Sequence, residues 1–220
     1  MIVFFSSVDS SSHAHLNFQK ILLDAVFQNI DAHDLRDFHL SIPFTDTNIQ
    51  YTEPAHHRPP IFREAVLAFD QQNLVEFRLF QWMFKGNLRI DFLPHSVHVV
   101  GIDNCSQEFE LHCRRLPRDA EKVMLCGNRI FGTLDLQNLP VNLVVLNLLR
   151  NNLYGGFSLV DLPEKLEVLN LWENKGIGQD IVLYRNLPKC LSEIRLVNVK
   201  EVRPTEKKYR VHDESIFVIE

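Results

Sequence analysis

Apolar residues recur with a fixed period over residues 70–200, and this period is the strongest pattern in the chain. Five Leu-Pro pairs begin at positions 93, 116, 139, 162 and 187, so successive pairs lie 23, 23, 23 and 25 residues apart. The segment that starts at Asp70 lacks the pair but keeps apolar residues at the other positions of the unit. Such a period is typical of repeat proteins, so we expect about six stacked units.

Each unit contains an alternating apolar core that predicts a short β-strand. After Leu139-Pro140 the sequence reads LxxLxLxxNxLxGxFxL, in which Leu143, Leu146 and Leu148 are the first apolar positions. Side chains alternate between the two faces of a strand, so these leucines point inward and the residues between them point outward. A second alternation follows at residues 132–136 and 155–159. It predicts another short strand and then a turn or 3₁₀ piece, because little room remains for a helix.

An asparagine after the strand recurs at Asn128, Asn151 and Asn174. Its amide can satisfy backbone groups of its own turn and of the next unit, which a buried loop requires. We therefore expect these residues to form a ladder, with Cys105 as a small buried substitute. Trp82 and Val199 stand at the same position in other units. The glycines farther along predict a tight or left-handed backbone; they are Gly86, Gly132 and Gly155.

The flanking segments do not fit the repeat, and we interpret them as caps. Residues 1–69 form the N-terminal capping region, with a first strand at residues 1–5 and one helix that Ser12 caps and that runs to about Ile30. The apolar stripe of this helix is expected to cover the open end of the core, as repeat arrays require. Residues 43–60 are loop-like, and residues 61–69 form a helix or strand. Residues 201–220 form a C-terminal cap with a closing strand at residues 216–219.

The units resemble those of the leucine-rich-repeat family, written LPxxLxxLxLxxNxLxGxLxL, over residues 70–200. The resemblance implies a right-handed solenoid with parallel strands on its concave face and short strands or 3₁₀ turns on its convex face. With the helical N-terminal cap, the whole chain would be α/β. The family's usual role, binding a protein partner, is what the resemblance implies for function.

The outward positions of neighbouring units predict a partner-binding surface on the concave face. Apolar side chains gather there on successive strands, and an exposed apolar patch usually marks an interaction site. Tryptophan, methionine and arginine are also typical of interfaces. A flank or a second copy of the chain, as in a homodimer, could instead cover this patch. The expected surface consists of Met124, Val145, Asn147, Leu149, Val168, Asn170, Trp172 and Arg195.

Charge, apolar-segment length and cysteine pattern narrow the possible partners. The formal charge of −5 argues against nucleic acid, which needs a clustered basic surface. No run approaches the roughly 18 apolar residues of a membrane span, so no membrane partner is expected. Four cysteines without a CxxC pair suggest reduced thiols, and we expect an intracellular protein, cytoplasmic or nuclear.

Catalytic and cofactor motifs are missing: GxxxxGK[ST], GxGxxG, GxSxG and HExxH do not occur. We therefore expect a non-enzymatic scaffold with no cofactor and no metal. Two alternatives remain. A metal-dependent hydrolase could centre on His13, His15, His56 and His57, together with His33 or Asp34. The chain could also be a structural subunit of a larger assembly whose apolar patch is permanently buried.

Overall fold

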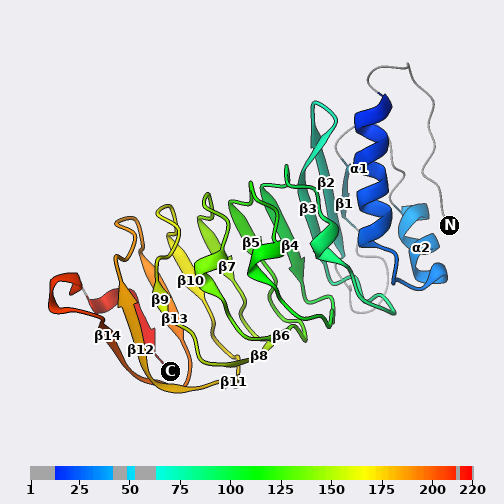
Figure 1. Ribbon diagram of the computed structural model, residues 1–220. Coiled ribbons are helices and arrows are strands. Elements are labelled where there is room, and N and C mark those ends of the chain that lie inside the picture. Colours follow the sequence, from blue (N-terminus) through cyan, green and yellow to red (C-terminus); the bar gives the residue numbers. More distant parts are fainter. Residues whose placement is uncertain (1–12, 42–48, 53–62, 212–213, 220) are drawn as a thin grey trace.

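The computed structural model describes residues 13–41, 49–52, 63–211 and 214–219, and this part of the chain is α/β with mostly parallel sheets and few helices. Figure 1 shows the strands in one row, with both helices at the N-terminal end. The strand expected at residues 1–5 and most of the loop expected at residues 43–60 lie outside the described residues. The expectation of a loop was wrong at Ile49–Thr52, which form a strand because they pair with residues 64–67.

A nine-stranded sheet runs through the molecule in the order β1-β2-β3-β4-β5-β7-β10-β13-β15. β1 and β2 pair antiparallel, as do β2 and β3, and every later pair is parallel. Its strands are β1 (Ile49–Thr52), β2 (Glu64–Asp70), β3 (Asn73–Phe80), β4 (Val99–Asp103), β5 (Lys122–Met124), β7 (Val145–Asn147), β10 (Val168–Asn170), β13 (Glu193–Leu196) and β15 (Phe217–Ile219). Of the two forms expected for residues 61–69, the structure has the strand.

The register of the parallel strands follows the sequence period. Glu76 pairs with Val99, and Val99 pairs with Lys122. Lys122 pairs with Val145, which also pairs with Val168. One period in sequence therefore moves a residue to the same place on the next strand, which is the stacking that the repeat predicts.

Short strands and 3₁₀ turns return the chain from one strand of the large sheet to the next. They form two three-stranded sheets, with orders β11-β8-β6 and β14-β12-β9. The strands are β6 (Phe131–Gly132), β8 (Asn152–Gly155), β9 (Leu159–Val160), β11 (Gly176–Ile177), β12 (Gln179–Arg185) and β14 (Val199–Pro204). The 3₁₀ turns are η1 (Ile90–Phe92), η2 (Cys113–Arg115), η3 (Leu136–Asn138), η4 (Lys207–Tyr209) and η5 (Glu214–Ile216). The expected second strand thus exists, although β6 and β8 end before most of the alternating residues.

The inward leucines of all units join one continuous apolar core. Leu143, Leu146 and Leu148 are fully buried, and the equivalent residues of the neighbouring units lie in the same cluster. Burying a leucine side chain is worth about 2 kcal/mol. Each unit depends on its neighbours for this burial, because a short strand cannot cover its own apolar row.

The asparagine ladder is present and joins each unit to the one before it. Asn151 donates from Nδ2 to the carbonyl of Leu148 in its own unit and to that of Leu125 in the preceding one. Its Oδ1 accepts the backbone N–H of Ile130. Asn128 and Asn174 make the same kinds of bond. The prediction that the amide bonds to the next unit was wrong, because its Nδ2 group donates to a carbonyl of the preceding unit.

Other residues fill the ladder position where asparagine is missing. Cys105 is fully buried, and its thiol donates to the carbonyl of Leu79, so the expected substitution is confirmed. Trp82 donates from Nε1 to the carbonyl of Glu64 at 3.0 Å. Val199 has no side-chain donor, but its neighbour Asn198 donates to the carbonyl of Ile177 at 3.0 Å.

Left-handed backbone recurs in the turns after the strands. The expected glycines are confirmed: Gly86, Gly132 and Gly155 have φ values of 97°, 113° and 80°. A side chain at Gly86 would place its Cβ 1.9 Å from the carbonyl oxygen of Asn29, so the turn also needs glycine for space. A second series precedes the ladder position and was not expected; it consists of Gln81, Asn104, Gly127, Arg150, Glu173 and Asn198.

The N-terminal region contains two helices, α1 (His13–Val26) and α2 (Ala32–Ser41), so the expectation of one helix was wrong. α1 ends before Ile30, because Asp31 begins a new helix. The backbone N–H groups of His33 and Asp34 donate to its carboxylate and hold the pKa of Asp31 below its ordinary value. Leu23, Val26 and Phe27 are buried in the common core, and the rings of Phe27 and Phe77 lie 5.9 Å apart. α1 therefore packs on the first unit, as expected.

The expected closing strand is β15, and it continues the repeat rather than ending it. Phe217 pairs with Ile194, and Val218 pairs with Arg195, each one period farther along the sequence. The segment interpreted as a C-terminal cap therefore adds another parallel strand to the large sheet.

Candidate functional site

The expected surface lies on three neighbouring strands, β5, β7 and β10, and extends onto β13. Met124 pairs with Asn147, Asn147 with Asn170, and Asn170 with Arg195. Val145 and Val168 pair with each other in the adjacent column. We call the eight expected residues the sheet-face patch. Six of them are in register on the strands, and Leu149 and Trp172 follow directly after β7 and β10.

The apolar members of the sheet-face patch are neither fully buried nor fully exposed. Met124, Val145, Leu149, Val168 and Trp172 are each half-buried. Both helices lie at the far N-terminal end beside β1, β2 and β3, so neither covers this part of the sheet (Figure 1). The patch thus lies on the outer face of strands whose inner face is the core. Trp172 also packs against the core, and its Nε1 is buried with no hydrogen-bond partner among the described residues.

The two asparagines of the patch position the residues that follow them. Asn147 Oδ1 accepts the backbone N–H of Leu149 at 3.2 Å, and Asn170 Oδ1 accepts that of Trp172 at 3.0 Å. These bonds fix the backbone that carries Leu149 and Trp172. Within the described chain, neither amide nitrogen donates to a protein acceptor, so the Nδ2 groups can bond to a bound molecule.

Trp172 and Arg195 form the C-terminal side of the patch. The Arg195 guanidinium carbon lies 5.3 Å from the centre of the Trp172 ring, within the range of a cation–π contact. Arg195 also pairs with Glu193 two residues before it. The positive charge is thereby compensated inside the chain, and the patch as a whole favours an apolar partner surface over a charged one.

Asp103 marks the N-terminal side of the patch. Its Oδ1 accepts the backbone N–H of Cys126 at 2.8 Å. Burial raises the pKa of Asp103, while this bond and the Arg78 charge act in the opposite direction. The next unit therefore holds the carboxylate in place through this hydrogen bond, while burial removes water from it and disfavours its charged form.

The cysteines lack the properties of catalytic nucleophiles. Burial raises the pKa of Cys105 and Cys126 to about 12 and that of Cys113 to about 11. Only a thiolate attacks efficiently, so these three thiols are inert at neutral pH. Cys190 is exposed and donates to backbone carbonyls of the preceding unit.

Most of the histidines named as possible metal ligands lie outside the described residues. His13 and His15 begin α1, but their side chains are not described, and His56 and His57 lie outside the described residues entirely. His33 is exposed in α2, and Asp34 Oδ2 accepts the backbone N–H of Lys85 at 2.6 Å. Among the described residues, no group of three or more potential ligands lies together.

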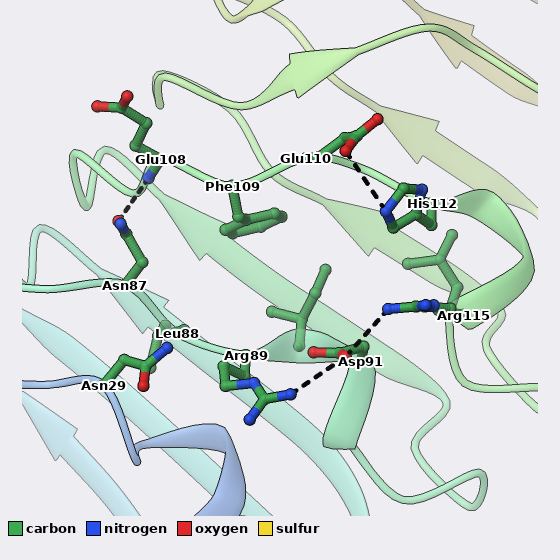
Figure 2. Close-up of a pocket in the computed structure, with 12 residues that line it drawn as sticks. Asn29, Asn87, Leu88, Arg89, Asp91, Glu108, Phe109, Glu110, His112 and Arg115 are labelled. Atoms are coloured by element: carbon green, nitrogen blue, oxygen red, sulfur yellow. Dashed lines mark hydrogen bonds and ion pairs between the residues drawn. The ribbon is translucent and has the colours of Figure 1, made fainter.

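A cavity of about 320 Å³ lies where α1 meets the first two units, among residues that the sequence pattern did not single out as a site. Figure 2 shows two chain segments facing each other across it, residues 87–91 and 108–115. Arg89 and Arg115 both approach the carboxylate of Asp91, at 3.9 and 3.5 Å. Glu110 lies 3.7 Å from His112 on the other side. No sequence motif predicts this meeting, because the residues come from successive units and become neighbours only through stacking.

Comparisons with protein-family models, curated proteins and solved structures gave no significant match. Among the described residues, no helix is both long and apolar enough to cross a membrane.

Proposed function

We propose that this chain is a leucine-rich-repeat solenoid that acts as a non-enzymatic scaffold and binds a protein partner through the sheet-face patch. In the geometry that the resemblance implies, this patch is the concave surface. The observation that carries the proposal is the set of five half-buried apolar side chains on three adjacent strands and directly after two of them, away from both helices. Apolar area of this kind stabilises a complex when a partner removes it from water.

The polar groups of the patch support a protein as the partner. The half-buried Asn147 has an Nδ2 group without an acceptor in the described chain, and this group can donate to the backbone carbonyls that every protein surface offers. Asn170 beside it is only 8% exposed and holds the backbone of Trp172. Trp172 and Arg195 add the residue types that most often dominate binding energy. The centre is apolar and the charges are paired internally, so binding should depend weakly on salt.

The chemistry of the thiols supports the non-enzymatic part of the proposal. Burial raises the pKa of Cys105, Cys113 and Cys126, and Cys105 and Cys113 belong to the core. Free thiols also suit a reducing intracellular compartment, which we include in the proposal.

The test is capture of partners by the full-length tagged chain from the cells that express it, with the variant Trp172→Glu. The matched control is Tyr154→Glu, because Tyr154 is 47% exposed on β8, outside the large sheet. We expect the wild type and Tyr154→Glu to capture the same proteins and Trp172→Glu to lose them. Equal capture by all three would contradict the proposal.

Light scattering on the same three proteins identifies the case in which the partner is a second copy. Under the proposal all three are monomers when purified alone. A wild-type dimer that Trp172→Glu converts to a monomer would show that the patch serves self-association, as in the homodimer or structural-subunit alternative.

A further inference from the structure

We propose that the cavity between α1 and the first two units binds an oxyanion carried on an aromatic or apolar body. The site is independent of the sheet-face patch, because its residues belong to the return segments of the units and to the end of α1. Its volume of about 320 Å³ lies at the lower end of the range for small-ligand sites, which is about 300–1,000 Å³.

The lining of the cavity carries two guanidinium groups, Arg89 and Arg115, and three carboxylates, and both guanidinium groups lie near only one of the carboxylates. Arg89 and Arg115 approach a single carboxylate, that of Asp91, and leave one positive charge without a partner among these three groups. The contacts of 3.9 and 3.5 Å are longer than a charge-assisted hydrogen bond of about 2.8 Å. Both guanidinium groups therefore keep donors for a second anion.

Arg89 is held in place before any ligand arrives. Its guanidinium carbon lies 4.1 Å from the centre of the Phe92 ring, and its Nη1 donates to Gln28 Oε1 at 3.2 Å. Its backbone N–H donates to the carbonyl of Val26 at the end of α1. A preorganised guanidinium loses less side-chain entropy on binding, which favours recognition of a planar carboxylate or of a phosphate.

The opposite segment supplies the apolar contact. The half-buried Phe109 ring points into the space between the two segments, and Leu88 and Leu116 also line the cavity (Figure 2). Glu108 and Glu110 extend away from Asp91 in this view, and Glu110 lies beside His112. A ligand with its anionic group at Arg89 and Arg115 would place its apolar body on Phe109.

If the site instead held a cation between Asp91 and the glutamates, the cationic probe would bind and the anionic probes would not. Calorimetric titration of the full-length chain with benzoate, phenyl phosphate and benzamidine separates the two. We expect benzoate or phenyl phosphate to bind and benzamidine not to bind. The stronger of the two anions identifies the natural group as a carboxylate or a phosphate. Binding of benzamidine alone, or of no probe, would overturn the proposal.

Three variants test the assigned roles. Arg115→Gln changes a side chain that is 62% exposed. It should lower the affinity for the anion about tenfold, because a charge-assisted hydrogen bond is removed. Asp91→Asn should raise the affinity for the anion several-fold, because a carboxylate that competes with it is lost.

Arg114→Gln is the matched control. Arg114 is also exposed in η2 but donates to Asn138, so the affinity for the anion should not change. Weaker anion binding by Asp91→Asn, or equal affinities in all three, would refute the site. Unchanged binding by Trp172→Glu separates this result from the outcome for the sheet-face patch.

Discussion

The central units and the first unit fill the same ladder position in different ways. In the central units, Asn128, Asn151 and Asn174 bond to backbone groups of two adjacent parallel strands. In the first unit, Trp82 stands at this position and bonds to Glu64 of the antiparallel strand β2. These four residues therefore supply a buried donor to backbone carbonyls, and the neighbouring strand decides which side chain can reach them. Val199 at the same position has no donor, and Asn198 beside it makes the bond instead.

The two regions also differ in the side-chain packing around the residue at the ladder position. The buried amide of Asn174 is held among leucines, and its value lies in the bonds it makes. Trp82 stacks on Phe84 with ring centres 5.8 Å apart, and Arg63 lies 5.4 Å above its ring. Hydrogen bonds to buried backbone groups thus stabilise the central turns, whereas the ring contacts of Trp82 add to its hydrogen bond at the N-terminal end.

Replacing the ladder amide should have the largest effect. Asn174→Ala leaves the carbonyl of Leu171 and the N–H of Leu153 without their side-chain partner inside the core, whereas the carbonyl of Leu148 keeps its bond from Asn151. Each unsatisfied buried group costs about 1–3 kcal/mol, so we expect a loss of at least about 2 kcal/mol in the free energy of unfolding. Urea denaturation followed by circular dichroism measures it.

The control for this variant is Asn152→Ala, at an exposed asparagine in β8 of the same array. It should change the free energy of unfolding by less than about 0.5 kcal/mol. Equal losses in the two variants would mean that the ladder bonds contribute nothing specific.

Removing only the hydrogen bond of the first unit should cost less. Trp82→Phe retains an aromatic ring beside Phe84 but leaves the Glu64 carbonyl without its side-chain donor. We expect a loss of about 1 kcal/mol, the net value of one such bond. Trp82→Leu, which also removes the ring stack, should cost about 2–3 kcal/mol in the same denaturation experiment. If Trp82→Phe were as damaging as Asn174→Ala, the distinction between the two regions would fail.

The register of the large sheet could be predicted from the sequence, because residues one period apart take equivalent places on neighbouring strands. Once Leu146 and Leu169 occupy the same place in their units, Val145 and Val168 must lie side by side. The sheet-face patch follows from that alone. The same period applied to Ile194 leads to Phe217, so a signal for the last strand was present in the sequence.

Other features carried little or no signal in the residues. The residues with left-handed backbone before the ladder position include Arg150 and Glu173. These residue types rarely adopt a left-handed backbone, so the sequence did not predict it. The second helix had a weak signal in Asp31, a good N-cap residue. The cavity had none, because the pairing of Arg115 with Asp91 depends on how two return segments stack.

The smallest effect concerns Asp103, at the boundary between the two regions. Burial raises its pKa in the folded chain above the ordinary value of 3.8, so the folded state binds a proton more tightly than the unfolded state. Stability contributed by this group is therefore lost as pH rises from the unfolded pKa through the folded one. Asp103→Asn does not titrate and can still accept the Cys126 N–H, so it should gain stability relative to the wild type between pH 4 and pH 7.

Thermal melts of both proteins across this pH range measure the effect as a difference, with the exposed Asp119→Asn as the control. A difference between Asp103→Asn and the wild type that stays constant or reverses sign with pH would show that burial does not govern this carboxylate.

The central claim is that the ladder stabilises the array while the outward residues remain available for a partner. Trp172 and Asn174 are two residues apart, one half-buried on the sheet face and the other fully buried. The most direct measurement is therefore the free energy of unfolding of Trp172→Glu beside that of Asn174→Ala. We expect Trp172→Glu to lose no more than about 1 kcal/mol and Asn174→Ala to lose at least about 2 kcal/mol. An equal or greater loss in Trp172→Glu would place that tryptophan in the structural core and contradict the account.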